Sequence, residues 1–384
     1  MRFVFFVLLL NLSAKAQNKV TGIIKDKENN QPIAGASIFL NNTSIGTAST
    51  RAGTFELNVP AGKFDLVISS IGYETYTAII SAETAYLNVS LLPKAKELAT
   101  VVIEPADKNG WENWGRFFIE GFVGTSSYAA QCTIKNYKAI KFRNSKKTGQ
   151  LTAYALEPLI IENKKLGYII QYQLEEFMFD FNSKYLSYVG YPFFKAMKGS
   201  TVRQKKWAAN RKEVYEGSMM HFMRSLYLNT ITKEGFEVRS LHKQPNLEKE
   251  RVKQIFSTSA GNSDSSHYYD RILNQPNQFS IVGKNILPRD SFAYVIDSTT
   301  SGLAFDNFLL ILYKKRAAPA EYRKQFPGSS ASMLSEITLF NSQPVEIQSN
   351  GNYYQPLDLL SLGYWSWSEK IATMLPLDYM PNKK

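Results

Sequence analysis

Cysteine and histidine are scarce in this chain, which has one Cys and three His in 384 residues. Cys132 therefore has no partner for an internal disulfide, and stability must come from burial alone. A zinc site needs His and carboxylate ligands on one face, for instance His-x-x-Glu. None of His221, His242 and His267 has Glu at that spacing. His267 has Asp270 three residues later but no second histidine in register, so we expect no metal site.

Several catalytic and cofactor motifs are also missing. The chain has no Gly-x-Ser-x-Gly elbow, no P-loop and no dinucleotide fingerprint, which argues against serine hydrolases and nucleotide enzymes that use them. We expect no cofactor and, on balance, no enzymatic activity. One alternative stays open, a hydrolase acting on cell-wall or surface glycan. Its two carboxylates need be neighbours only in space, which a sequence cannot reveal.

No apolar run approaches the roughly 20 residues that span a bilayer, so we expect no transmembrane helix. The N-terminal run Phe3–Leu10 follows Arg2 and precedes a small-x-small site at residues 14–16. This pattern predicts a signal peptide over residues 1–16, with Gln17 as the mature N-terminus. A lipoprotein signal would need Cys at the cleavage point, so lipid anchoring is not predicted.

A period of two is clearest between Val20 and Leu92. Short apolar-polar runs there end at Gly, Pro or Asn signals, which favours antiparallel strands. The expected strands are Val20–Ile24, Ala36–Leu40, Thr54–Val59, Phe64–Ser70, Thr75–Ile80 and Tyr86–Leu91, with a further edge strand at Leu98–Ile103. The pattern predicts a small β-sandwich.

The same stretch resembles the carboxypeptidase regulatory-like domain. The resemblance rests on Thr21–Asp26, Gln31–Ile38, Gly53–Leu57, Pro60–Leu66 and Ile71–Glu74. It implies a seven-stranded, transthyretin-like sandwich over residues 18–104. It also implies an exported protein of a Gram-negative bacterium, in the periplasm or at the outer-membrane surface. Despite the family name, it implies no peptidase activity.

The formal net charge of +12 is unevenly spread. Residues 17–106 hold seven basic and eight acidic side chains, so the excess lies beyond residue 106. The densest basic run contains Lys195, Lys198, Arg203, Lys205, Lys206, Arg211 and Lys212, with Trp207 interleaved. The run is interpreted either as a solvated helix face or as a contact for an anionic lipid headgroup, an acidic glycan or an envelope protein. Nucleic acid is not an expected partner of an exported protein.

Residues 107–384 mix helical and strand periods, which predicts an α+β region. Aromatics from Trp111 to Phe118 recur at helical spacing, and Ser218 can cap a helix to Asn229 that contains His221. His221 joins the candidate binding residues, although a lone helical histidine is more often structural.

The other expected elements of this region are mostly strands. The strands are Leu151–Leu156, Leu159–Ile161, Tyr168–Phe179, Tyr185–Tyr191, Ile281–Ile286, Phe292–Ile296, Phe308–Tyr313 and the pair Ile337–Phe340 with Val345–Gln348. A hairpin loop is expected at residues 163–167, and a polar exposed loop or variable insertion over Leu241–Asn277. A closing helix is expected from Ser366 or Ser368 to about Met374.

This second region resembles, more loosely, the C-terminal part of envelope proteins that carry the regulatory-like domain, at Gly167-Tyr168, Gly217-Ser218, His221-Phe222 and Gly363–Trp365. That resemblance brings no known activity. The sequence therefore predicts a mainly β, α+β protein made of a signal peptide, a docking sandwich and a basic binding or assembly domain.

Overall fold

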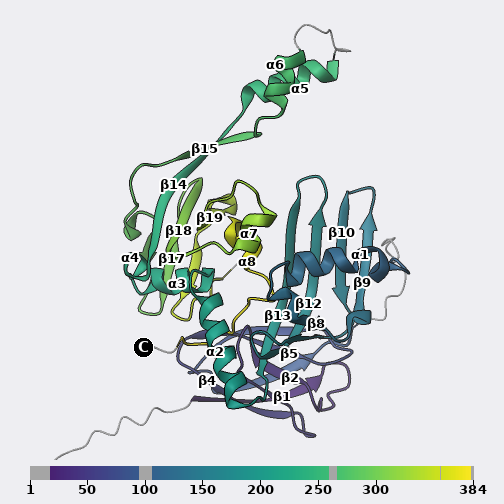
Figure 1. Cartoon of the computed structure of the whole chain (residues 1–384). Coiled ribbons are helices and arrows are strands. Elements are labelled where there is room, and N and C mark those ends of the chain that lie inside the picture. Colours follow the sequence, from purple (N-terminus) through teal and green to yellow (C-terminus); the bar gives the residue numbers. More distant parts are fainter. Residues whose placement is uncertain (1–17, 95–105, 259–265, 355, 382–384) are drawn as a thin grey trace, which may run out of the picture. The chain divides into compact units, whose positions relative to one another are not determined.

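The computed structural model describes residues 18–94, 106–258, 266–354 and 356–381 (Figure 1). Contacts divide the chain into two compact units. One comprises Met1–Asn41 and Ile45–Ala99, and the other comprises Asn42–Ser44 and Thr100–Lys384. The predicted signal peptide (1–16) and edge strand (98–103) lie outside the described residues.

The first unit is a β-sandwich of seven strands in two sheets. One sheet has the order β4-β1-β7 (β1 Asn18–Asp26, β4 Thr54–Val59, β7 Tyr86–Leu91). The other has the order β3-β2-β5-β6 (β2 Ser37–Leu40, β3 Gly46–Ala48, β5 Lys63–Ser69, β6 Tyr76–Ser81). The predicted seven-stranded sandwich is confirmed. One pair departs from the antiparallel expectation, because β1 and β7 run parallel.

The core of this unit follows directly from the period of two. On β4 the residues Phe55, Leu57 and Val59 are buried while their neighbours are exposed. They pack with Val20, Ile24 and other apolar residues of both sheets. Alternate burial of this kind is what a two-layer sandwich requires.

A six-stranded antiparallel sheet opens the second unit. Its strands are β8 (Cys132–Ile134), β9 (Ile140–Ser145), β10 (Gln150–Ala155), β11 (Leu159–Asn163), β12 (Tyr168–Asp180) and β13 (Tyr185–Ala196). The long strand β12 pairs with β13 along one edge. Its other edge pairs with β11 over the first half of β12 and with β10 over the second half. The predicted strands and the loop at residues 163–167 are therefore present.

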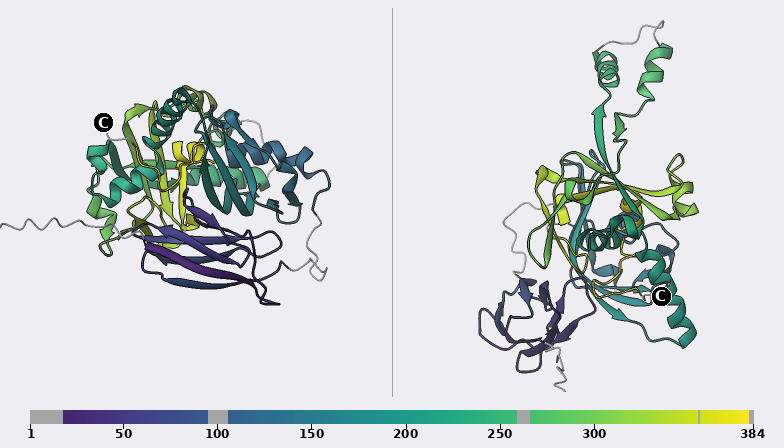
Figure 2. Two further views of the ribbon diagram at one scale, coloured as in Figure 1. Left: turned by 90° about the horizontal axis from the view of Figure 1, so that it is seen from below. Right: turned by 90° about the vertical axis from the view of Figure 1, so that its left-hand side faces the viewer.

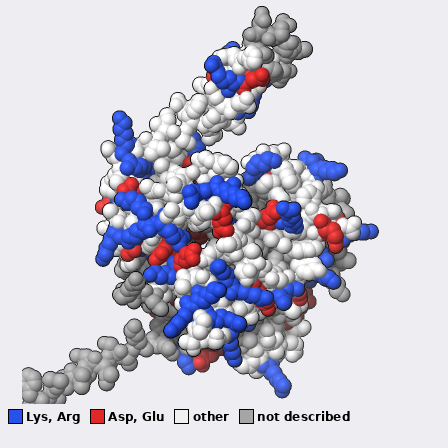
Figure 3. All heavy atoms as spheres, viewed as in Figure 1, with Lys and Arg blue, Asp and Glu red and all other residues white. Residues whose placement is uncertain are grey.

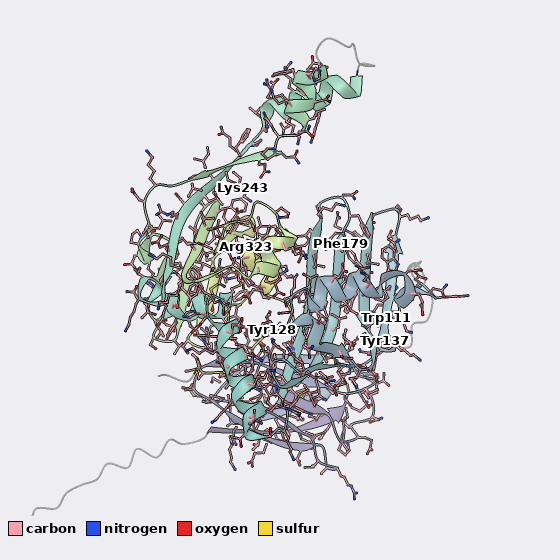
Figure 4. All side chains as sticks on the ribbon, viewed as in Figure 1. Trp111, Tyr128, Tyr137, Phe179, Lys243 and Arg323 are labelled. Carbon is pink, nitrogen blue, oxygen red and sulfur yellow. The ribbon has the colours of Figure 1, made fainter. Side chains whose placement is uncertain are left out.

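Helix α1 (Gly110–Phe118) lies across one face of this sheet (Figure 1). It continues through a π-helical turn, Ile119–Val123, and ends at Gly124, whose φ of 109° suits glycine. Trp111 contacts Tyr137 with ring centroids 4.7 Å apart, and both are labelled in Figure 4. The predicted aromatic helix is confirmed.

Two further sheets complete the second unit. A five-stranded sheet has the order β15-β14-β18-β19-β21, and a small one has the order β16-β17-β20. Their strands are β14 (Phe236–Pro245), β15 (Gln278–Val282), β16 (Ala293–Val295), β17 (Thr300–Leu303), β18 (Phe308–Ala317), β19 (Ser332–Leu339), β20 (Val345–Gln348) and β21 (Leu359–Gly363). Helices α3 (Met219–Tyr227), α4 (Ile231–Glu234), α7 (Ala320–Gln325) and α8 (Tyr364–Ser368) accompany them.

Two expectations for these sheets are wrong. β19 and β20 do not pair with each other, because β19 pairs with β18 and β21 while β20 pairs with β17. The closing helix begins earlier than predicted, at Tyr364 after Gly363, and ends at Ser368. Ser366 and Ser368 therefore lie inside it and cap nothing.

Residues 241–277 were expected to form an exposed loop or a variable insertion, and the loop alternative is wrong because the described residues there form a strand and two helices. The β14–β15 ribbon runs out from the sheet and carries α5 (Leu247–Thr258) and α6 (Ser266–Leu273) at its end (Figures 1 and 2). Val252 and Ile272 are buried there, whereas every residue of β15 is exposed. This ribbon with its helices is called the arm below.

Candidate functional site

The predicted basic run spans the end of β13 and helix α2 (Thr201–Tyr215). Ser200 caps the helix, its hydroxyl accepting a hydrogen bond from the Arg203 backbone N–H. Trp207 and Tyr215 are the buried residues of α2, and most of its other side chains face solvent. Lys and Arg side chains gather over the part of the surface where Figure 1 draws α2 (Figure 3).

Helix α2 is fixed to the loop between β11 and β12 by side-chain hydrogen bonds. Donors at i, i+3 and i+4 lie on one helix face and reach successive loop carbonyls. Trp207 Nε1 donates to Lys164 O (2.9 Å), Asn210 Nδ2 to Lys165 O (2.7 Å), and Arg211 Nε and Nη2 to Leu166 O (2.7 Å) and Gly167 O (3.1 Å). These hydrogen bonds fix the loop backbone, and the side chains of Lys164 and Lys165 take no part in them.

Two members of the predicted run are thus anchors of the fold. The Arg211 guanidinium lies 3.9 Å from the centroid of the Tyr168 ring, and burial lowers its pKa. Trp207 packs where Gly167 leaves room, because a Cβ at Gly167 would come within 2.2 Å of the indole. Gly167 also has φ of 71°, a conformation that glycine adopts without strain.

A pocket of about 520 Å³ opens between α2 and this loop. Its lining consists of Ser127, Gln131, Lys164, Lys165, Arg203, Lys206, Trp207 and Asn210. Four of these residues are cationic and none is acidic. We call this the basic pocket.

The four cations of the basic pocket lack acidic partners. Within the part of the chain that the structure describes, no ion pair involves Lys164, Lys165, Arg203 or Lys206. Lys165 Nζ lies 5.3 Å from the centroid of the Tyr128 ring, labelled in Figure 4, and Lys164, Arg203 and Lys206 are exposed. Like charges around one cavity repel one another, so an anion bound there would be stabilised by all four.

The remaining cations of the run lie outside the pocket lining. Lys195 extends over the Phe193 ring at 5.4 Å, and Lys212 lies 3.7 Å from Glu216. Lys198 and Lys205 are exposed. The structure therefore brings Arg203, Lys206 and Trp207 together and leaves these four apart.

His221 lies in the core of the second unit and does not line the basic pocket. Its Nδ1 accepts from the Gly217 N–H (3.2 Å), and Nε2 lies 3.4 Å from Glu234 Oε2, so the neutral ring carries its proton on Nε2. Burial is the main cause that lowers its pKa, with Glu234 opposing. The ring packs against Tyr215 and Phe236. Its contacts are those of a structural histidine.

Lys164 and Lys165 are pocket residues that sequence reasoning missed. The predicted hairpin loop contains both, but nothing local links it to a helix that begins at residue 201. The donors Trp207, Asn210 and Arg211 recur at helical spacing in the sequence, but this spacing does not identify the loop whose carbonyls they bind.

Other candidate chemistry gives no site. Burial raises the pKa of the Cys132 thiol to about 12, which makes it a poor nucleophile. Across residues 18–94, 106–258, 266–354 and 356–381, no three His, Cys, Asp or Glu side chains converge on a metal position. In these same ranges no helix combines the length and apolar character needed to cross a bilayer.

Three solved structures are similar to the chain at low TM-score. They are a type II cohesin–X-dockerin complex from Acetivibrio cellulolyticus (25% identity, TM-score 0.17, 19% of this chain and 51% of that one), a DUF3823 family protein from Bacteroides ovatus (11%, 0.17, 48% and 82%), and a protein of unknown function from Bacteroides fragilis described as membrane-associated (10%, 0.16, 86% and 92%). The chain spans about half the length of the first. No curated protein matches the chain.

The family comparison concerns the first unit. Residues 20–103 match the model of the CarboxypepD_reg-like domain, and the described part of this stretch is the seven-stranded sandwich. The match covers the residues on which the sequence resemblance rests. The chain therefore carries a carboxypeptidase regulatory-like domain at residues 20–103.

Proposed function

We propose that this is an exported, non-enzymatic envelope protein whose second unit binds an anionic ligand in the basic pocket. In this proposal residues 1–16 are removed on export, residues 18–104 form a docking module, and residues 107–384 form the binding or assembly domain. The protein acts in the periplasm or at the outer-membrane surface. The observation that carries the proposal is a pocket of about 520 Å³ with four cations and no carboxylate.

The size of the pocket supports binding of a small headgroup or saccharide. Sites for small molecules usually enclose about 300–1,000 Å³, and the basic pocket falls within that range. Its loop side is fixed by the α2 hydrogen bonds described above. A fixed loop loses less freedom on binding than a mobile one, so more of the electrostatic attraction appears as affinity.

The same lining argues against glycan hydrolysis in this pocket. Hydrolysis of glycosides generally uses two carboxylates about 5–10 Å apart, and the basic pocket has none. A second cavity, lined in part by Glu213, Glu321 and Glu369, has about 70 Å³. That volume is well below the roughly 300–1,000 Å³ usual for a small-molecule site, so the cavity is too small for a sugar ring.

Charge removal inside and outside the pocket tests the proposal. Retention of the mature protein would be measured on an immobilised acidic polysaccharide and on phosphatidylglycerol vesicles. Changing Arg203 and Lys206 together to Gln should reduce retention about tenfold at low salt, while changing Lys198 and Lys205 to Gln should reduce it far less. Both variants lose two charges, so they differ only in position.

Salt and stability complete the test. Retention of the wild type should fade as salt nears roughly 1 M, where the Debye length is about 3 Å. The melting temperatures should barely change, because exposed charges contribute little to stability. Equal retention of the two variants would mean that the basic run is only a solvated helix face, and would refute the proposal.

A further inference from the structure

We infer that the ligand of the basic pocket is a phosphorylated saccharide, an inference that rests on the proposed function and narrows it. The pocket's cations come from two sides. Lys164 and Lys165 belong to the β11–β12 loop, whereas Arg203 and Lys206 belong to α2. A compact dianion placed between the loop and the helix can meet cations of both.

Charge distinguishes a phosphate ester from a carboxylate here. A carboxylate brings one negative charge and two oxygens, which leaves most of the four cations uncompensated. A phosphomonoester carries about −1.5 to −2 at pH 7 and three strong acceptor oxygens. Lys offers three N–H donors and Arg five in a planar fork, so three oxygens can each receive charge-assisted hydrogen bonds from more than one side chain.

The neutral part of the lining suits a hydroxylated ring. Ser127, Gln131 and Asn210 place a hydroxyl and two amides beside the cations. The Asn210 amide nitrogen is engaged with Lys165 O, which leaves its carbonyl oxygen to accept from a sugar hydroxyl. The Ser127 N–H and hydroxyl donate to Glu321 at 2.9 and 3.3 Å, so Ser127 can act only as an acceptor. The several hydroxyl donors of a saccharide match these acceptors, whereas inorganic phosphate brings at most one or two P–OH donors.

The position of Glu321 adds to this selectivity. Its carboxylate is held by Ser127 and is not part of the pocket lining. It therefore leaves the four cations unneutralised while it orients the Ser127 oxygen. The anionic and the hydroxylated ends of the ligand would thus have separate places.

Isothermal titration of the mature chain with matched small molecules tests the inference. Glucuronic acid keeps the sugar ring but carries a carboxylate, and inorganic phosphate keeps the phosphate charge without the ring. Comparing both with glucose 6-phosphate separates the contributions of the ring and of the charge. Glucose 6-phosphate should bind at least about tenfold more tightly than either of the others at low salt. Changing Lys164 and Lys165 to Gln should weaken its binding about tenfold or more, while the Lys198/Lys205→Gln control should bind as the wild type does.

Loss of binding by the loop variant cannot be mistaken for unfolding. The loop is held through its carbonyl groups, which the substitutions keep, so the melting temperature should match that of the control. Phosphatidylcholine vesicles with and without phosphatidylinositol 4-phosphate then separate the sources of the same chemistry. Selective vesicle binding would assign the site to a phosphorylated lipid headgroup, and binding of soluble glucose 6-phosphate alone would assign it to a free sugar phosphate.

Different results would contradict the proposed function and the narrower inference about a phosphorylated saccharide. If glucuronic acid or inorganic phosphate binds as tightly as glucose 6-phosphate, the inference is overturned, and the proposal that the basic pocket binds an anion stands. If glucose 6-phosphate binds equally to the loop variant and the control, the pocket is not its site and the inference is overturned. If in addition no anion distinguishes pocket variants from controls, the proposed function falls with it.

Discussion

Replacing Glu369 by Gln should stabilise the second unit at pH 8 and leave its stability near pH 4.5 almost unchanged. Glu369 follows α8, and its Oε1 accepts from the Met219 N–H at the start of α3 (2.9 Å). Burial raises the pKa of this carboxyl to about 7, against the lowering effect of that hydrogen bond. The folded state therefore binds a proton more tightly than the unfolded chain, whose Glu titrates near 4.5.

The sign of the pH dependence follows from linkage. Between about pH 4.5 and 7 the folded state holds more protons than the unfolded state, so stability falls as pH rises. The difference of about 2.5 pKa units corresponds to at most about 3.4 kcal/mol of stability, fully lost above pH 7. Gln keeps the acceptor for Met219 and removes the buried charge, so the variant should gain about 2–3 kcal/mol at pH 8.

Urea unfolding from pH 5 to 8, followed by tryptophan fluorescence, measures this gain. All five tryptophans lie beyond residue 110, so the signal reports the second unit. Lys370, whose pKa burial lowers to about 8, adds stability as pH rises from 8 toward 10.5 in both proteins and cancels in the difference. The exposed Glu112→Gln serves as the control. A Glu369→Gln variant that tracks the wild type at every pH, or is less stable at pH 8, would refute the reasoning.

Four further results are expected. Gly167→Ala should lower stability by about 2 kcal/mol or more in urea unfolding, since φ is positive and Trp207 must move; an unchanged midpoint would contradict the packing. Replacing residues 246–277 by Asn-Gly should shift the melting temperature little, because Pro245 and Gln278 already face each other in the ladder; loss of folding would show that the arm stabilises the sheet. Mass spectrometry should find Gln17 at the N-terminus of the mature protein. A mature chain that still contains residues 1–16 would refute the predicted signal peptide. Residues 18–104 alone should melt cooperatively, whereas an unfolded spectrum would show dependence on the second unit.

The sandwich could be predicted because its information is local. β4 alternates strictly in burial, and turn residues such as Gly53 and Gly72, both at positive φ, separate the strands. Within the sandwich, strand β3 was not predicted, because its three residues are too few to show a period. The parallel pairing of β1 with β7 joins residues about 65 apart and leaves no local mark.

The arm was misread because its helices bury little. α5 and α6 pack chiefly on each other, so few buried apolar positions, such as Val252 and Ile272, suffice. Helices of this kind lack the wide apolar stripe that identifies a helix against a core. The predicted pairing of β19 with β20 was wrong for a different reason, since the sequence gives no sign that β20 pairs with β17 in another sheet while β19 pairs with β21.

The basic run shows which pocket residues a charge pattern can predict and which it cannot. Arg203, Lys206, Trp207 and Asn210 recur at i, i+3, i+4 and i+7, which places them on one face of α2, and that face lines the pocket. Lys205 and Lys212 fall on other faces. The period alone could therefore have divided the run into pocket and surface cations. It could not have supplied Lys164 and Lys165, because their approach depends on the carbonyls of a loop some forty residues earlier meeting the donors of α2. The fold thus makes one pocket from two separate stretches of charge, and the four cations line a common space only when the hairpin and the helix have packed.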